Sequence, residues 1–165
     1  MAQRTNFADM TCSVARAWSV IGEPWTPLII RDLIIGLHRF DDLRADLGVS
    51  SSVLSDRLAT LEASGVVERV NYKSEQRSRD EYHLTDIGKE LVPVLATVMS
   101  WGDKWFADSG APGLIVHDTC SNSGVEPVVV CKQCGDPITA DNAHLIAGPG
   151  MRQQAGTLLL GLGPK

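Results

Sequence analysis

The apolar positions in the first part of the chain recur at helical spacing. They predict one helix over residues 11–21, a break at residues 22–25, and a second helix that begins near Thr26 and ends near Gly36. Thr26 suits an N-cap, and Pro27 suits the first helical turn, where a missing N–H costs nothing. The second helix is so apolar that we expect it to be central and buried. Its apolar positions are Leu28, Ile29, Leu33 and Ile34.

Two further helical patterns follow, separated by a short turn. Phe40, Leu43 and Leu47 share one face of the first, and Gly48 suits its C-terminal end. Ser50 suits the N-cap of the second, which ends near Gly65 and has Leu54, Leu58 and Leu61 on one face. Two short helices joined by a glycine-containing turn are typical of a helix-turn-helix. Residues 50–64 are then the predicted recognition helix.

A β-hairpin and a long helix are predicted next. Residues 66–72 and 82–84 have strand character, and the polar residues 73–80 lie between them, which predicts a wing. Thr85 suits the N-cap of a helix over residues 86–107, with a slight kink at Pro93.

From Ser109 onward Gly, Pro, Asn and Asp become frequent, which predicts a boundary near residues 108–112. The fold class is therefore mainly α with a small β-hairpin wing (α+β). A winged helix-turn-helix domain for DNA binding and dimerisation is expected over residues 1–108. A cysteine-containing extension of loop and β structure is expected over residues 109–165.

Charge and composition narrow the function only slightly. The net charge of −5 argues mildly against a nucleic-acid partner, but the charge on the docking surface matters more than that of the whole chain. The first eleven residues lack the apolar core of a signal peptide, and no apolar run approaches the roughly 18 residues that a membrane helix needs. We expect a cytoplasmic protein without a membrane segment.

The exposed side of the predicted recognition helix carries hydroxyl groups. Small side chains at a helix N-terminus let the backbone approach DNA, and the helix dipole favours phosphate. Arg57 suits either a phosphate or an acidic neighbour such as Glu62 or Asp42. In the wing, Arg69 adds to a basic cluster opposed by Glu75. The alternative is a capped helix followed by a solvated hairpin. The predicted DNA contacts are Ser50, Ser51, Ser52, Ser55, Arg57, Lys73, Arg77 and Arg79.

The first and last helices carry more aromatic residues than a small core needs, which favours a homodimer interface. The alternative is packing against the extension. The predicted interface residues are Trp18, Leu95, Val98, Trp101 and Trp105.

Cys12 lies near the start of the first helix, with Arg16 one turn later. The helix dipole and the guanidinium both favour a thiolate, so Cys12 is a redox candidate. The alternative is a small buried apolar side chain.

The extension contains a second thiol cluster. Cys131 and Cys134 have the spacing of a zinc knuckle, and His117 and Cys120 have the same gap, so these four residues are predicted to hold a structural zinc ion. His144 competes as the fourth ligand. Reduced thiols or a Cys131–Cys134 disulfide are the alternatives, and no other cofactor is indicated.

Catalysis is not indicated. The histidines are scattered, no serine lies in a nucleophile-elbow motif, and no glycine-rich phosphate loop follows a strand. A thiol oxidoreductase that uses the C-x-x-C pair would lack its usual βαβ context. We therefore predict no enzyme.

A series of short motifs occurs in an order that resembles the HxlR family, winged-helix regulators related to the MarR group. The likeness runs from Cys12 to Trp105, and the extension resembles that of longer members. The motifs are Cys12-Ser13-Val14-Ala15-Arg16-Ala17, Gly22-Glu23-Pro24-Trp25-Thr26, Arg31-Asp32-Leu33, Arg39-Phe40, Leu54-Ser55-Asp56-Arg57-Leu58, Leu61-Glu62, Tyr82-His83-Leu84-Thr85 and, in the extension, Val130-Cys131-Lys132-Gln133-Cys134-Gly135 followed by Gly148-Pro149-Gly150.

The resemblance implies a homodimeric transcription regulator that binds duplex DNA, expected to be a repressor, with a small molecule or an oxidant as effector. Some members of the family use a cysteine at the position of Cys12 as a redox sensor, so a thiol-responsive regulator is one alternative. A winged-helix protein-interaction module without DNA binding is another. This chain departs from the family's usual Gly-Lys-Trp at Glu23-Pro24-Trp25, and it has no proline before Arg77 in the wing.

Overall fold

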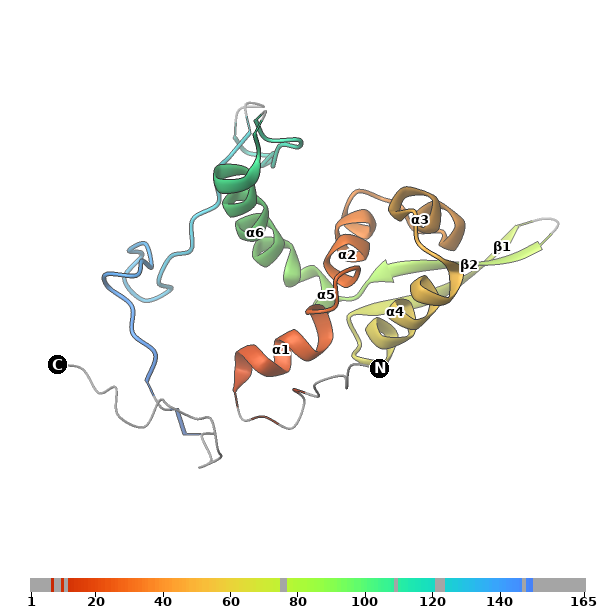
Figure 1. Ribbon diagram of the computed structural model, residues 1–165, viewed down its shortest axis with the longest axis horizontal. Helices are drawn as coiled ribbons and strands as arrows, with labels where there is room; N and C mark the ends of the chain where they lie inside the picture. Colours follow the sequence, from red (N-terminus) through yellow and green to blue (C-terminus); the bar gives the residue numbers. More distant parts are fainter. Residues whose placement is uncertain are drawn as a thin grey trace.

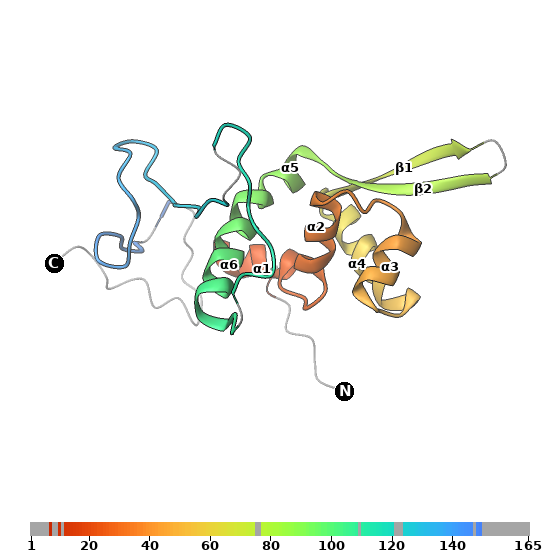
Figure 2. The ribbon, with the colours of Figure 1, turned by 90° about the horizontal axis from the view of Figure 1, so that it is seen from above.

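The computed structural model describes residues 7, 10, 12–74, 77–108, 110–120, 124–146 and 148–149, and excludes the side chains of residues 72–79. Helices form one compact group from which the hairpin projects, while the extension leaves the group at the opposite end (Figures 1 and 2). The elements are α1 (Ser13–Ile21), α2 (Thr26–Ile34), α3 (Phe40–Leu47), α4 (Ser51–Ala63), β1 (Val67–Ser74), β2 (Arg77–Leu84), α5 (Asp86–Lys89) and α6 (Leu91–Phe106).

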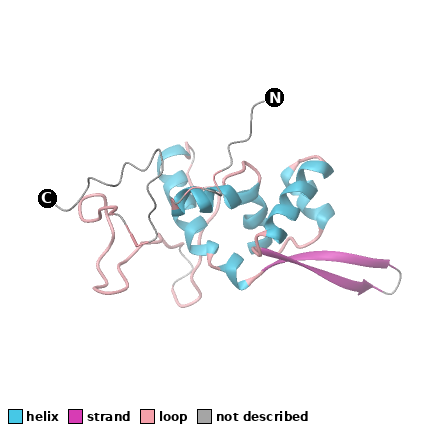
Figure 3. Cartoon of the chain, turned by 90° about the horizontal axis from the view of Figure 1, so that it is seen from below, coloured by secondary structure: helices cyan, strands magenta, loops and turns pink. Residues whose placement is uncertain are grey.

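The core lies between α2, α3, α4 and the base of the hairpin. Ile29, Ile30 and Leu33 of α2 are buried there, which confirms that this apolar helix is central. Tyr82 of β2 joins the same cluster, and α2 also contacts α6. The whole arrangement is a winged helix-turn-helix, as predicted, with the helices packed together at the root of the two strands (Figure 3).

The turn between α3 and α4 has the expected chemistry. Gly48 ends α3 in the left-handed conformation, with φ at 64°, and its N–H donates to the carbonyl of Arg44. Any residue other than glycine would be sterically strained in this conformation. Ser50 then caps α4, because its side chain accepts a hydrogen bond from the Val53 amide. Gly48 therefore ends α3 and Ser50 begins α4 within one short turn.

The wing is longer than the sequence pattern indicated. We expected residues 73–80 to be a polar loop, but β1 and β2 pair in antiparallel register from Val67 opposite Leu84 to Ser74 opposite Arg77. The expectation was wrong because backbone hydrogen bonds and cross-strand pairs sustain a two-stranded ladder without any apolar residue.

Two helix boundaries also differ from the prediction. Thr26 is the first residue of α2 and is buried, and Trp25 occupies the N-cap position without a side-chain hydrogen bond. The predicted long final helix is divided at Glu90 into α5 and α6. Pro93 explains the division, since it has no N–H for the carbonyl of Lys89, four residues earlier, and its ring clashes with that carbonyl.

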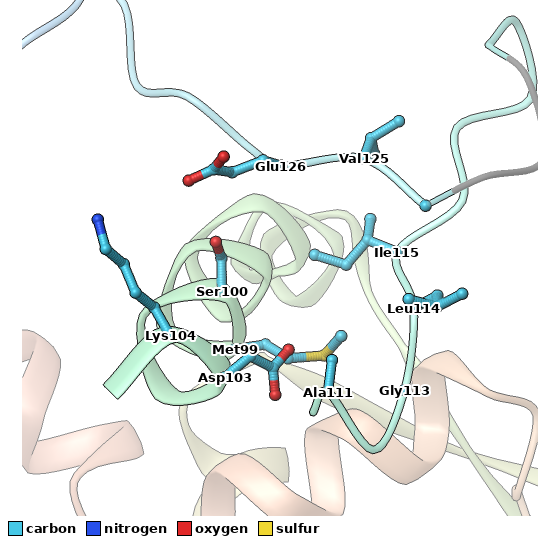
Figure 4. A pocket seen from close by; sticks show the side chains of 11 residues that line it. Met99, Ser100, Asp103, Lys104, Ala111, Gly113, Leu114, Ile115, Val125 and Glu126 are labelled. Carbon is cyan, nitrogen blue, oxygen red and sulfur yellow. The ribbon is translucent and has the colours of Figure 1, made fainter. Parts of the chain in front are cut away.

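The extension folds over the end of α6 and then leaves it. Ala111, residues 113–115 and residues 124–126 border a hollow beside the helix. Glu126 lies on the side of Ser100 and Lys104 of α6, while Leu114 and Ile115 lie at the opposite side (Figure 4). Between residues 110 and 146, the described part of the chain has no helix or strand beyond an isolated bridge from Val130 to Pro137. The division into domains at residue 108 stays a prediction.

The structure contains no membrane helix within the residues it describes, because none of those helices combines the length and apolarity that a bilayer requires.

Candidate nucleic-acid interface

The N-terminal half of α4 presents a polar surface. Leu54, Leu58 and Leu61 are buried, so the helical period turns the intervening residues outward. Ser51, Ser52 and Ser55 are exposed, as are Asp56 and Ala59. This arrangement leaves the start of α4, with its free amide groups and small side chains, open to a ligand.

Ser50 has a structural role at the same helix end. Its hydroxyl accepts a hydrogen bond from the amide of Val53 at 3.4 Å and lies 3.2 Å from the hydroxyl of Ser52. Ser51 and Ser55 are the serines of this surface that remain most clearly available to DNA, since neither the cap nor the core uses their side chains. Ser50 acts mainly through the helix it caps.

Arg57 of α4 is turned inward. Its Nη2 lies 3.3 Å from Oε2 of Glu23, and only 16% of its side chain is exposed. The acidic neighbours considered from the sequence, Glu62 and Asp42, are not the partners in this ion pair. Nε and Nη1 of Arg57 are buried without a hydrogen-bond partner in the described part of the molecule. Arg57 therefore fixes α4 against the segment before α2, and it is poorly placed to contact a phosphate.

A second ion-pair network holds α3 against α2. Asp32 is fully buried in α2, its Oδ1 lies 2.6 Å from Nη2 of Arg31, and that nitrogen also lies 3.1 Å from Oδ2 of Asp46 in α3. Burial raises the pKa of Asp32, an effect that Arg31 opposes. Sequence reasoning missed this network, although adjacent opposite charges in an apolar helix are a usable signal.

The root of the wing is held by charged pairs. Arg69 of β1 forms an ion pair with Asp80 of β2, and the amide of Asn71 donates to the same carboxylate at 2.9 Å. Hydrogen bonds from Arg69, then from Asn71, lower the pKa of Asp80. Arg39 reaches Glu81 at 3.3 Å. Arg69 is therefore neutralised within the hairpin and adds little to its basic character.

Three predicted basic contacts lie at the far end of the hairpin. The backbone register places Lys73 opposite Ser78, Arg79 opposite Tyr72, and Arg77 opposite Ser74. Their side chains lie outside the described part of the structure. The backbone therefore brings Lys73, Arg77 and Arg79 to the same end of the hairpin, where Asp80 directly follows Arg79 in the chain.

The base of β2 is locked to the helices by backbone and ring contacts. The Tyr82 amide donates to the carbonyl of His38 at 2.8 Å, and Nδ1 of His38 donates back to the carbonyl of Tyr82 at 3.0 Å. The rings of His38 and His83 stack with centroids 4.3 Å apart. These contacts fix the direction of the wing relative to α3 and α4.

A large apolar surface remains uncovered on α1 and α6. Trp18 of α1 is 54% exposed, and Trp101 and Trp105 of α6 are 59% and 63% exposed. Val98 is exposed on the same helix, whereas Leu95 packs partly against the core. Leu95 therefore belongs to the inner side of α6, and the other four predicted interface residues lie on the open surface.

Comparison with known proteins decides the family. The family model described as HxlR-like helix-turn-helix matches residues 20–109. The chain belongs to the HxlR family. It is a transcriptional regulator with a helix-turn-helix fold, as the resemblance in its motifs predicted.

Individual members of the HxlR family show how far the likeness extends. The HTH-type transcriptional regulator Rv3095 of Mycobacterium tuberculosis is 38% identical over 141 residues, which are 85% of this chain and 88% of Rv3095. The structure of PA1607, described as a transcription factor, has a TM-score of 0.76 at 34% identity and covers 86% of this chain and 98% of its own. An alignment of 141 residues cannot fit within residues 1–108, so the extension is shared in part.

The structure of the redox regulator HypR, in its reduced form, has a TM-score of 0.53 at 30% identity. The match covers 56% of this chain and 92% of HypR.

In this HxlR protein Cys12 is the N-cap residue of α1 and is half-buried. The guanidinium of Arg16 donates to the carbonyl of Met10 at 2.8 Å. Arg16 is thus engaged by the backbone, and the redox role of Cys12 stays a prediction.

The four predicted zinc ligands lie as two pairs. Nδ1 of His117 is 3.3 Å from Sγ of Cys120. The backbone amides of Cys134 and Gln133, followed by the Cys134 thiol, donate to Cys131 and lower its pKa. Within the described residues, no three His, Cys, Asp or Glu side chains meet in one cluster that could hold a metal. His144 is exposed.

We expect the ion pair between Glu23 and Arg57 to contribute to the stability of this HxlR domain. A double-mutant cycle of Glu23→Gln and Arg57→Met, followed by urea unfolding, should give a coupling energy of about 0.5–3 kcal/mol, because each single change leaves one charged group poorly paired. Asp41→Asn with Arg44→Met is the matched control, since that exposed pair is 3.9 Å apart. Coupling that is equal in both pairs would contradict the positioning role of Arg57.

Proposed function

We propose that this HxlR protein is a homodimeric repressor that binds duplex DNA in a sequence-specific manner and acts in the cytoplasm. One observation carries the proposal. The exposed serine surface at the start of α4 and the basic tip of a long wing belong to a single rigid unit, anchored by buried leucines and by the contacts of His38 with Tyr82. A major groove admits one helix, and a wing beside that helix meets the backbone or the minor groove.

The acidic net charge is compatible with this function because the charges are sorted by position. Arg69, Arg39 and Arg57 are paired with carboxylates at the root of the wing and inside the domain. Lys73, Arg77 and Arg79 are gathered at the tip by the strand register. Phosphate attraction depends on the local field, so a basic tip on an acidic protein suffices to steer it to DNA. In this proposal Ser51, Ser52 and Ser55 contact base edges or phosphates.

The exposed aromatic surface supports the homodimer. A monomer rarely leaves several tryptophans uncovered on two helices, and aromatic residues are enriched in protein interfaces. A two-fold dimer through α1 and α6 would present two copies of α4 to half-sites about one helical turn apart. The occupant that we propose for this surface is therefore a second copy of the chain.

A thiol-responsive regulator is the second candidate function. The observation that favours it is the position of Cys12 at the N-cap of α1, beside the proposed dimer surface, together with the likeness to the redox regulator HypR. Oxidation of Cys12 would alter the relative position of the two copies of α4 in the dimer.

We predict that the wing tip supplies phosphate contacts. Arg77→Ala and Arg79→Ala should weaken binding to all duplexes and reduce the slope of log affinity against log salt by about one for each phosphate that is no longer neutralised. Fluorescence anisotropy at several salt concentrations measures both quantities. Lys132→Ala, which removes a charge from the extension, is the matched control and should leave the slope unchanged. If the wild-type protein does not bind DNA even at low salt, the alternative function as a protein-interaction module without DNA binding is favoured.

The dimer surface has its own test. Trp101→Asp should convert the dimer to a folded monomer, since a carboxylate cannot be buried there without a partner. Light scattering gives the mass and circular dichroism the helix content. Leu145→Asp, at an exposed apolar position in the extension, should leave the mass unchanged. A wild-type protein that is monomeric at micromolar concentration would refute the homodimer.

For the thiol response, treatment with a peroxide should lower the DNA affinity of the wild type and leave Cys12→Ser unaffected. Cys120→Ser is the control, because it keeps Cys12 and removes another exposed thiol. The same anisotropy titration measures the effect after oxidant removal. An equal response of the wild type and Cys12→Ser would exclude Cys12 as the sensor.

A further inference from the structure

The hollow between α6 and the extension has the size of a small-molecule site. Its volume is about 550 Å³, and pockets that take small molecules measure roughly 300–1000 Å³. Residues 113–115 and 124–126 of the extension form one wall, and the C-terminal half of α6 forms the other (Figure 4). On the helix side the lining residues are Met99, Ser100, Asp103 and Lys104.

The wall formed by the extension is fixed by its own backbone. The Val125 amide donates to the carbonyl of Ile115 at 2.8 Å, which joins the two segments that line the hollow. Gly124 has a φ of 76°, and a Cβ there would lie 3.2 Å from Cδ2 of Leu114. Glycine suits this position because it adopts the left-handed conformation without strain and leaves room for Leu114. The two segments therefore form one continuous surface.

The inner part of the hollow is apolar. Met99, Ile115 and Val125 line it, and each is half-buried. A Cβ on Gly113 would lie 4.0 Å from the terminal methyl group of Met99, so the helix and the extension are in close contact at this end. A ligand that fills the hollow would remove these apolar side chains from water, which favours binding. The hollow therefore suits a ligand with an apolar body.

The charges of the lining give the hollow its polarity. Asp103 and Glu126 contribute carboxylates from the helix and from the extension, and neither side chain has an ion-pair or hydrogen-bond partner among the described residues. Lys104 is the single cation of the lining, and its Nζ lies 5.3 Å from the centre of the Trp105 ring, a favourable cation–π contact. Two unpaired carboxylates beside one ammonium group leave the hollow with a net negative charge. Such a site attracts cations and disfavours anions.

The hollow lies on the side of α6 that faces away from the exposed tryptophans. Met99 precedes Trp101 by two residues, and Asp103 precedes Trp105 by two residues. Two residues correspond to about 200° around a helix, so each lining residue points almost opposite to the tryptophan that follows it. A homodimer formed through the tryptophans would therefore leave the hollow open to solvent.

We propose that this hollow binds an organic cation that has an apolar body. Asp103 approaches the positive charge from the helix, Glu126 approaches it from the extension, and Ser100 lies between them in Figure 4. Met99 and Ile115 cover the apolar body. Binding involves no covalent step. Because the cation contacts α6 and the extension together, it holds the extension against the helix.

The inference deepens the proposed function by naming a class of effector, and this part of it rests on DNA binding. α6 contacts α2, and α2 contacts α3 of the helix-turn-helix. A ligand shifts an equilibrium between two arrangements only if it binds one of them more tightly. A cation that requires α6 and the extension to be in contact meets this condition, and it thereby alters the DNA affinity.

The test uses the full-length protein and two ions of the same shape and opposite charge, tetraphenylphosphonium and tetraphenylborate. Equilibrium dialysis should give a dissociation constant in the micromolar range for the phosphonium and at least about tenfold weaker binding of the borate. Asp103→Asn and Glu126→Gln should each weaken binding of the phosphonium at least about fivefold, whereas Lys104→Met should strengthen it. Asp118→Asn is the matched control, because it changes the net charge equally at an exposed position outside the hollow.

A second measurement locates the bound cation. In protein labelled at the methionine methyl groups, the NMR signal of Met99 should shift as the phosphonium is added. The signal of Met10, which does not line the hollow, should stay in place. If the cation binds without moving the Met99 signal, it binds elsewhere and the proposal is overturned.

Equal affinity for the two ions would also overturn the proposal, as would unchanged binding by both Asp103→Asn and Glu126→Gln. The effector role has its own readout, since saturating phosphonium should change the DNA affinity of the wild type at least about fivefold and leave that of Asp103→Asn unchanged. Cation binding without any change in DNA affinity would overturn the effector role. A protein that binds the cation but no DNA would overturn the proposed function and leave the cation site standing.

Discussion

Burial of the leucine face of α4 is the constraint on which the rest of the molecule depends. Leu54, Leu58 and Leu61 are almost completely excluded from solvent, and each contributes about 1.5–3 kcal/mol by leaving water. Because a helix has 3.6 residues per turn, fixing these three side chains in the core also fixes which residues face outward. The serines at the start of α4 are exposed for this reason. The exposed serine surface is thus a consequence of core packing.

Ion pairs then determine which charges remain available at that surface. Arg57, Arg69 and Arg39 are each paired with a carboxylate, and these pairs fix α4 and the hairpin in place. The long register of β1 and β2 places Lys73, Arg77 and Arg79 far from the core. This separation explains how an acidic HxlR protein can have a basic tip. The contacts of His38 with Tyr82 and His83 set the direction of the wing. That direction determines how the wing could contact DNA.

The elements that depend on local pattern were predictable from sequence, and those that depend on distant partners were not. The periodic leucines, Gly48 and Ser50 predicted the helix-turn-helix, since each acts within one or two turns of its own helix. The pairing of Glu23 with Arg57 joins residues far apart in the chain, so no spacing rule predicts it. The full length of the wing was missed because polar strands lack apolar alternation. Pro93 indicated a kink, and the break occurs three residues earlier because the missing hydrogen bond and the ring clash act on the preceding turn.

The central claim is that two copies of α4 enter the major groove of one duplex. Its most direct test is hydroxyl-radical footprinting of the wild-type protein on genomic fragments recovered with it after crosslinking. The account predicts two protected half-sites related by pseudo-two-fold symmetry, about 10 base pairs from centre to centre, with flanking protection from the wings. A single protected half-site, or fragments without any protected sequence in common, would contradict it.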